Sequence, residues 1–89
     1  MNMPNKDKQL ITLSSMSLGQ KALIVAFSFD IDGGEHVQKM GIYPGEQLEI
    51  VRLSSRGGAV EIKISGYFVS LRKEEADRIM VKPHVHKIT

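Results

Sequence analysis

The sequence predicts a mainly β fold, a small barrel of about five short strands with one or two short helical turns. Three observations carry this prediction. Short runs of apolar residues, several of them alternating with polar ones, recur along the chain. Glycine-containing turn sequences separate these runs. A chain of 89 residues is long enough for one hydrophobic core but too short for two.

Domain organisation follows from where the patterning begins and ends. Residues 1–10 are polar and lack periodicity, so we expect a flexible N-terminal segment there. The barrel should span residues 11–82, and residues 83–89 should form a C-terminal tail. Within the barrel, residues 11–20 should be a lead-in whose leucines cover one end of the core.

The next segments are expected to form a strand and a helical turn. Residues 21–29 are rich in β-favouring side chains and predict a strand. Aspartates and glycines at residues 30–34 predict a turn that ends this strand. Residues 35–40 are long enough for one helical turn, which would bring Val37 and Met40 to the same side.

A three-stranded meander is predicted for the middle of the chain. Pro44-Gly45 is typical of a type II turn, and a strand should follow at residues 47–53, with a change of parity that indicates a bulge. Residues 60–64 alternate cleanly, so Val60, Ile62 and Ile64 should face the core. Gly66 then separates this strand from its partner at residues 67–71.

The end of the barrel is expected to combine a short helix with a last strand. Residues 72–77 contain good helix formers, and Ala76 and Ile79 can face inward. Residues 79–81 should form the final strand. We expect the strands to close into a barrel, because closure removes exposed sheet edges that would pair with other chains.

Composition excludes several classes of protein. With 42% hydrophobic and 25% charged residues, the chain has the composition of an ordinary globular domain. Neither a membrane-spanning apolar run nor a signal-peptide pattern is present, so a cytoplasmic location without membrane insertion is expected. The lack of cysteine rules out disulfides and thiolate chemistry.

Two further classes are disfavoured by the polar residues. The serines lie outside any nucleophile-elbow pattern and no phosphate-binding glycine loop is present, so no enzymatic activity is expected. The net charge of +2 is small, and the bases Arg72, Lys73 and Arg78 are interleaved with acids. We therefore expect a solvated surface there and no nucleic-acid partner.

One turn is the best candidate for a partner-binding surface. A glycine-flanked loop that carries apolar side chains on a rigid backbone is an unusual combination, and binding residues tend to lie on loops held by a scaffold. The candidate residues are Met40, Gly41, Ile42, Tyr43, Pro44 and Gly45. Under the alternative interpretation, Met40 and Ile42 fill the mouth of the barrel and the glycines serve backbone geometry.

The histidines are weak candidates for metal ligands. His84 and His86 fall on the same side of an extended segment, and His36 is the third histidine of the chain. A solvated tail is the simpler interpretation, so no cofactor is expected to be required, and weak binding of a divalent metal such as iron or zinc is the most that these residues suggest. An oxygen-rich cation loop is disfavoured relative to a plain turn at Asp30, Asp32 and Glu35.

An ordered set of short motifs resembles the ferrous-iron transport protein A (FeoA) family over about residues 11–81. The motifs are Leu18-Gly19-Gln20-Lys21-Ala22, Met40-Gly41-Ile42-Tyr43-Pro44-Gly45, Glu61-Ile62, Gly66-Tyr67 and Leu71-Arg72-Lys73-Glu74-Glu75-Ala76. This resemblance implies an SH3-like barrel. The module is also similar to the SH3-like domain of some metal-dependent bacterial repressors.

The resemblance implies a function as well. It suggests a cytoplasmic adaptor of bacterial ferrous-iron uptake that binds and modulates the membrane GTPase iron transporter, which would recruit it to the inner face of the membrane. A monomer or a weak homodimer is expected. The alternative is a metal-responsive regulatory module related to the domain of metal-dependent repressors.

Overall fold

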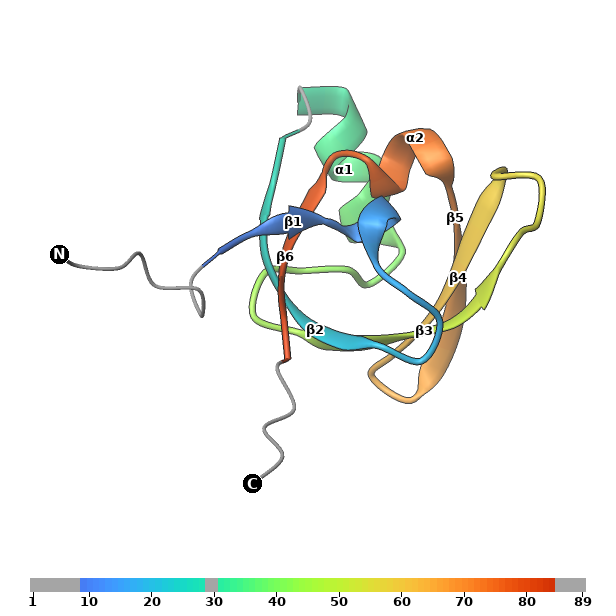
Figure 1. Cartoon of the computed structure of the whole chain (residues 1–89). Coiled ribbons are helices and arrows are strands. Elements are labelled where there is room, and N and C mark those ends of the chain that lie inside the picture. Colours follow the sequence, from blue (N-terminus) through green and yellow to red (C-terminus); the bar gives the residue numbers. More distant parts are fainter. Residues whose placement is uncertain (1–8, 29–30, 85–89) are drawn as a thin grey trace, which may run out of the picture.

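The computed structural model describes residues 9–28 and 31–84, apart from the side chains of residues 31–34. These residues form six strands, two α-helices and one 3₁₀-helix, η2 (Figure 1). The elements are β1 (Ile11–Thr12), η2 (Leu13–Ser15), β2 (Lys21–Phe27), α1 (Ile31–Lys39), β3 (Gln47–Leu53), β4 (Ala59–Ile64), β5 (Tyr67–Arg72), α2 (Lys73–Ala76) and β6 (Ile79–Pro83). The mainly β prediction is confirmed. Most of the expected flexible segment and tail lies outside the described residues.

Strands β3, β4 and β5 form the predicted meander. Val60, Ile62 and Ile64 are 6%, 0% and 1% exposed, whereas Lys63 between them is exposed, which confirms the predicted register. The pairing of β3 with β4 shifts between Ile50 and Arg52, where the change of parity predicted a bulge. This part of the sheet follows local alternation closely.

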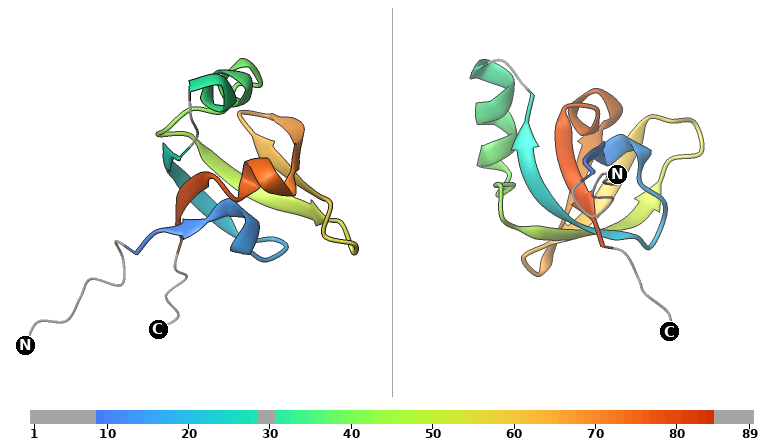
Figure 2. Two further views of the ribbon diagram at one scale, coloured as in Figure 1. Left: turned by 90° about the horizontal axis from the view of Figure 1, so that it is seen from above. Right: turned by 60° about the vertical axis from the view of Figure 1, so that its left-hand side comes forward.

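The sheet curls, but its two end strands do not pair with each other. Its order is β1-β6-β2-β3-β4-β5. Between the ends, η2 packs against α2 (Figure 2), and the Ser14 hydroxyl donates a hydrogen bond to the Asp77 carboxylate. Leu13 of η2 and Ala76 of α2 are buried beneath this contact. Short helices, not strand pairing, therefore complete the barrel.

The lead-in before β2 differs from its prediction. Ile11–Thr12 forms a short strand that pairs with β6, and Leu13 is buried, but Leu18 is 63% exposed. The expectation that the leucines of this segment cover the core is therefore wrong for Leu18. The strand was missed because its partner, Val81 opposite Ile11, is distant in the sequence.

Helix α1 begins at Ile31, so the predicted turn at residues 30–34 is wrong over Ile31–Gly34, while Asp30 lies outside the described residues. Glycine disfavours a helix by about 1 kcal/mol per residue, which led the sequence toward a turn. Packing offsets that cost, because Val37 is fully buried and Met40, just after the helix, packs on the core. Both Val37 and Met40 contact the core, so the prediction that they lie on the same side is confirmed.

Candidate functional site

The turn after α1 is held rigidly against the barrel. Gly41 and Gly45 adopt positive φ angles of +88° and +97°, and the Glu46 N–H donates to the Tyr43 carbonyl at 3.2 Å. With Pro44 and Gly45 at its centre, this is the predicted type II turn. Gly45 N–H donates to the Ile24 carbonyl at 2.8 Å, and Ile24 N–H donates to the Glu46 carbonyl at 2.9 Å, which fixes the turn to β2.

The side chains of this turn divide into core and surface. Ile42 is fully buried and Met40 is half-buried against the core, so these two residues fill the barrel as the alternative interpretation has it. Tyr43 is 47% exposed, and Pro44 and Gly45 are also exposed. Any partner contact made by the turn would therefore involve Tyr43 and Pro44, and Ile42 offers it no surface.

Tyr67 extends this surface from the β4–β5 hairpin. Its ring and hydroxyl lie directly against Gly41, where any Cβ atom would collide with the hydroxyl. The Ser65 hydroxyl of the same hairpin donates to Glu46 Oε1 at 2.8 Å. Tyr67 is 47% exposed, like Tyr43. We call Gly41, Tyr43, Pro44, Gly45 and Tyr67 the tyrosine surface.

Sequence reasoning did not assign Tyr67 to this site. Its motif, Gly66-Tyr67, marked a hairpin, but nothing local in the sequence indicates that the ring reaches the end of α1. The positive φ of Gly41 explains part of the need for glycine there, and the approach of Tyr67 explains the rest.

The two candidate histidines that the structure describes, His36 and His84, lie apart. His36 lies on α1 with its Nε2 atom 3.1 Å from Glu75 Oε2 of α2. His84 follows β6, which begins beside α2 and ends at the opposite end of the barrel (Figure 1). His86 and the side chain of Asp32 lie outside the described residues. Within the described part of the chain, no group of three or more metal-ligating side chains is found.

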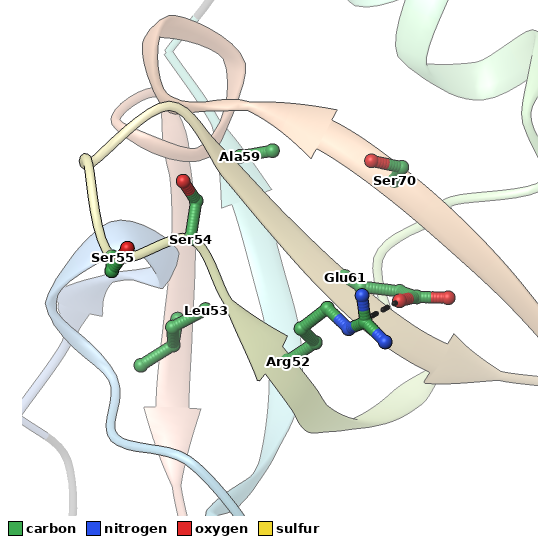
Figure 3. A pocket seen from close by; sticks show the side chains of 7 residues that line it. All are labelled: Arg52, Leu53, Ser54, Ser55, Ala59, Glu61 and Ser70. Carbon is green, nitrogen blue, oxygen red and sulfur yellow. Dashed lines mark ion pairs between the residues drawn. The ribbon is translucent and has the colours of Figure 1, made fainter.

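A shallow pocket lies on the outer face of the meander, beside the loop that joins β3 to β4 (Figure 3). The Arg52 Nε atom is 3.7 Å from Glu61 Oε1 within it, and serine hydroxyls make up much of the remaining polar lining. The lining residues are Arg52, Leu53, Ser54, Ser55, Ala59, Glu61 and Ser70. Its charges already pair with each other, so it presents no uncompensated charge to a ligand.

Asp77 is the described titratable group with a clearly displaced pKa. The hydrogen bond from Ser14 is the main cause and lowers the pKa of the Asp77 carboxyl below its ordinary value of 3.8, with Lys73 and Arg78 adding to the effect. The group is exposed and lies where η2 meets α2. Its role there is to join the two ends of the sheet.

The sequence and the fold were compared with known protein families and solved structures. A family model described as the FeoA domain matches residues 11–83. A crystal structure of an iron uptake regulatory protein (FeoA) is similar with a TM-score of 0.78 and 25% identity, over 85% of this chain and 100% of that one. Iron(II) transport protein A from Clostridium thermocellum is 34% identical with a TM-score of 0.78, over 82% of this chain and 45% of that one.

A manganese-dependent transcriptional repressor in complex with manganese shares the fold, with a TM-score of 0.80. The two chains are 21% identical, over 84% of this chain and 37% of the repressor. No curated protein matches the sequence.

Proposed function

Since the chain belongs to the FeoA domain family, we propose that it is a non-enzymatic adaptor of ferrous-iron uptake that binds and modulates the membrane GTPase iron transporter. Similarity to an iron uptake regulatory protein and to an iron(II) transport protein supports this proposal. Within residues 9–28 and 31–84, no helix is both long and apolar enough to span a bilayer. The adaptor would act in the cytoplasm and reach the membrane through its partner.

The observation that carries the proposal is the exposed ring of Tyr43 on a rigid turn. Tyrosine is frequent among interface hot spots, because its ring buries a large apolar area while its hydroxyl keeps a hydrogen bond. The turn is fixed to β2 by two backbone hydrogen bonds, so little conformational entropy would be lost on docking. The ring of Tyr67 beside Gly41 enlarges the apolar area available to a partner.

The test is the Kd of the intact chain for the cytoplasmic part of the transporter, measured by surface plasmon resonance. Replacement Tyr43→Ala should weaken binding by more than about 1 kcal/mol, or roughly fivefold in Kd. The melting temperature should stay close to that of the wild type, because the ring is about half exposed.

Phe68→Ala is the matched control. Phe68 is 60% exposed and therefore offers at least as much free aromatic surface as Tyr43, but it follows Tyr67 on β5 and projects to the other face of the sheet. It should leave the Kd unchanged. Equal losses in the two variants, or no loss in Tyr43→Ala, would remove the tyrosine surface from the proposal, and a wild-type chain that fails to bind the transporter would reject the adaptor function itself.

The fold shared with the manganese-dependent repressor favours one second candidate, a metal-responsive regulatory module. The two functions differ in their response to metal. Under the adaptor hypothesis the chain keeps the same oligomeric state when divalent metal is added. Under the regulatory hypothesis metal drives dimerisation, which sedimentation with and without Mn²⁺ would detect.

A further inference from the structure

His36 and Glu75 meet although they belong to different helices. His36 Nε2 of α1 lies 3.1 Å from Glu75 Oε2 of α2. The imidazole side chain is 62% exposed, whereas the Glu75 side chain is 17% exposed. One partner is therefore fixed against the protein and the other is open to water.

The Glu75 carboxylate is held in place by the start of its own helix. Its Oε1 atom accepts a hydrogen bond of 2.9 Å from the Arg72 N–H at the start of α2. Oε1 is thus occupied, and Oε2 is the oxygen that faces His36. Metal ligands in proteins are commonly held in this way by a hydrogen bond to the atom that does not touch the metal.

The separation of the two atoms suits neighbouring ligands of one cation. With metal–ligand bonds of about 2.1 Å, two neighbouring ligand atoms are roughly 3.0 Å apart in an octahedral sphere and roughly 3.4 Å apart in a tetrahedral one, and the observed 3.1 Å lies within this range. An imidazole nitrogen and a carboxylate oxygen together suit first-row divalent metals. We propose that His36 Nε2 and Glu75 Oε2 bind one such cation, with water completing its coordination sphere.

The charges around the pair permit such a cation. Lys73, the base within α2, is paired with Asp77 at 3.3 Å. On α1, the opposite charges of Glu35 and Lys39 balance each other. Two protein ligands make a weak site, which agrees with the lack of any larger ligand group among the described residues. A bound cation would link α1 to α2 and so restrain the helix that leads into the tyrosine surface.

Calorimetric titration of the intact chain with Zn²⁺ tests the site. We expect one cation per chain with a Kd between about 10 µM and 1 mM, the range of a site with few ligands. His36→Ala and Glu75→Gln should each weaken binding at least fivefold. Glutamine at position 75 can still accept the Arg72 N–H, so that variant keeps the cap of α2. His84→Ala, the matched histidine control, should bind as the wild type does.

A second measurement locates the cation independently of affinity. Paramagnetic Mn²⁺ should broaden the backbone amide signals around His36 and Glu75 before those of β3 and β4, and this broadening should disappear in His36→Ala. Binding that is lost in His84→Ala instead, broadening centred on the C-terminal residues, or no binding at 1 mM Zn²⁺ would each overturn the proposal. The outcome is separate from the adaptor function, because it requires no transporter.

Discussion

The meander of β3, β4 and β5 and the segment from α1 to Glu46 are held to the barrel in different ways. In the meander, two antiparallel ladders join the strands, the first of them interrupted by the shift between Ile50 and Arg52. Alternate side chains of β4 are buried in the core. In the segment from α1 to Glu46, Val37 and Ile42 are the buried side chains among those described. Its other ties are individual contacts: the His36–Glu75 pair, the approach of Tyr67 to Gly41, the Ser65–Glu46 hydrogen bond and two backbone hydrogen bonds to Ile24.

This difference separates stability from recognition. Many mutually supporting contacts make the meander cooperative, so the loss of one core side chain is felt by the whole domain. The turn after α1 is fixed by its hydrogen bonds to β2 and by the buried Ile42, whereas α1 itself is held by the buried Val37 and the His36–Glu75 pair. The position of α1 is therefore the part of this segment that a ligand can adjust.

The largest expected effect is in the meander. Ile62 is fully buried at the centre of β4, so Ile62→Ala should reduce the free energy of unfolding by about 2 to 5 kcal/mol. That is a large share of the roughly 5 to 15 kcal/mol typical of a whole domain. Urea denaturation followed by circular dichroism measures it.

Lys63→Ala is the neighbouring control, since Lys63 is exposed on the opposite face of the same strand. Its free energy of unfolding should lie within about 0.5 kcal/mol of the wild type. If the two variants were equally stable, the core-facing register of β4 would be incorrect.

An intermediate effect is expected where α1 ends. Gly41 and Gly45 both have positive φ, but a Cβ atom at Gly41 would meet Tyr67 whereas one at Gly45 would meet open space. Replacement by alanine should cost about 1 to 3 kcal/mol of backbone strain at each position, and Gly41→Ala should cost more because it also displaces the tyrosine. Thermal denaturation of both variants measures the difference.

Tyr67→Phe sharpens this comparison, because it removes the hydroxyl that lies over Gly41 and keeps the ring. In that background Gly41→Ala and Gly45→Ala should become similarly destabilising. A difference that persists without the hydroxyl would assign the extra cost to something other than the contact with Tyr67.

The two regions were also unequally predictable from the sequence. Alternation at Val60, Ile62 and Ile64 is a local signal whose meaning depends little on the rest of the chain, so the register, the bulge and the hairpins of the meander were predicted correctly. The Pro44-Gly45 turn was predictable for the same reason, since the two residues themselves favour its backbone geometry.

The α1 segment depends on contacts between residues that are distant in the sequence. Two glycines argued locally against a helix, and burial of Val37 in the barrel overrode them. The pairing of His36 with Glu75 and the approach of Tyr67 to Gly41 carry no local signature. The candidate turn was therefore found from the sequence, but its second tyrosine and the partner of His36 required the fold.

The smallest expected effect tests the contact that completes the barrel, between η2 and α2. The pKa of Asp77 is lowered below its ordinary value of 3.8, chiefly by the hydrogen bond from Ser14. A carboxyl whose pKa is lower in the folded state stabilises the fold above its unfolded pKa, and this contribution is lost as the pH falls through the folded value. Ser14→Ala should therefore be slightly less stable than the wild type at pH 7, and the two should converge as the pH falls below the folded-state pKa of Asp77, where the carboxyl is protonated in both folded and unfolded states.

Asp77→Asn separates this linkage from the other carboxyl groups of the chain. Asparagine can still accept the Ser14 hydroxyl but does not titrate, so the variant should lack the part of the acid-induced loss of stability that Asp77 contributes. Urea denaturation at a series of pH values between 2 and 7 would show it as a shallower slope below pH 4. A Ser14→Ala variant whose deficit stayed constant down to pH 2 would mean that the serine acts by packing alone, and that the ends of the sheet are joined by the buried side chains of Leu13 and Ala76 and not by the charged hydrogen bond above them.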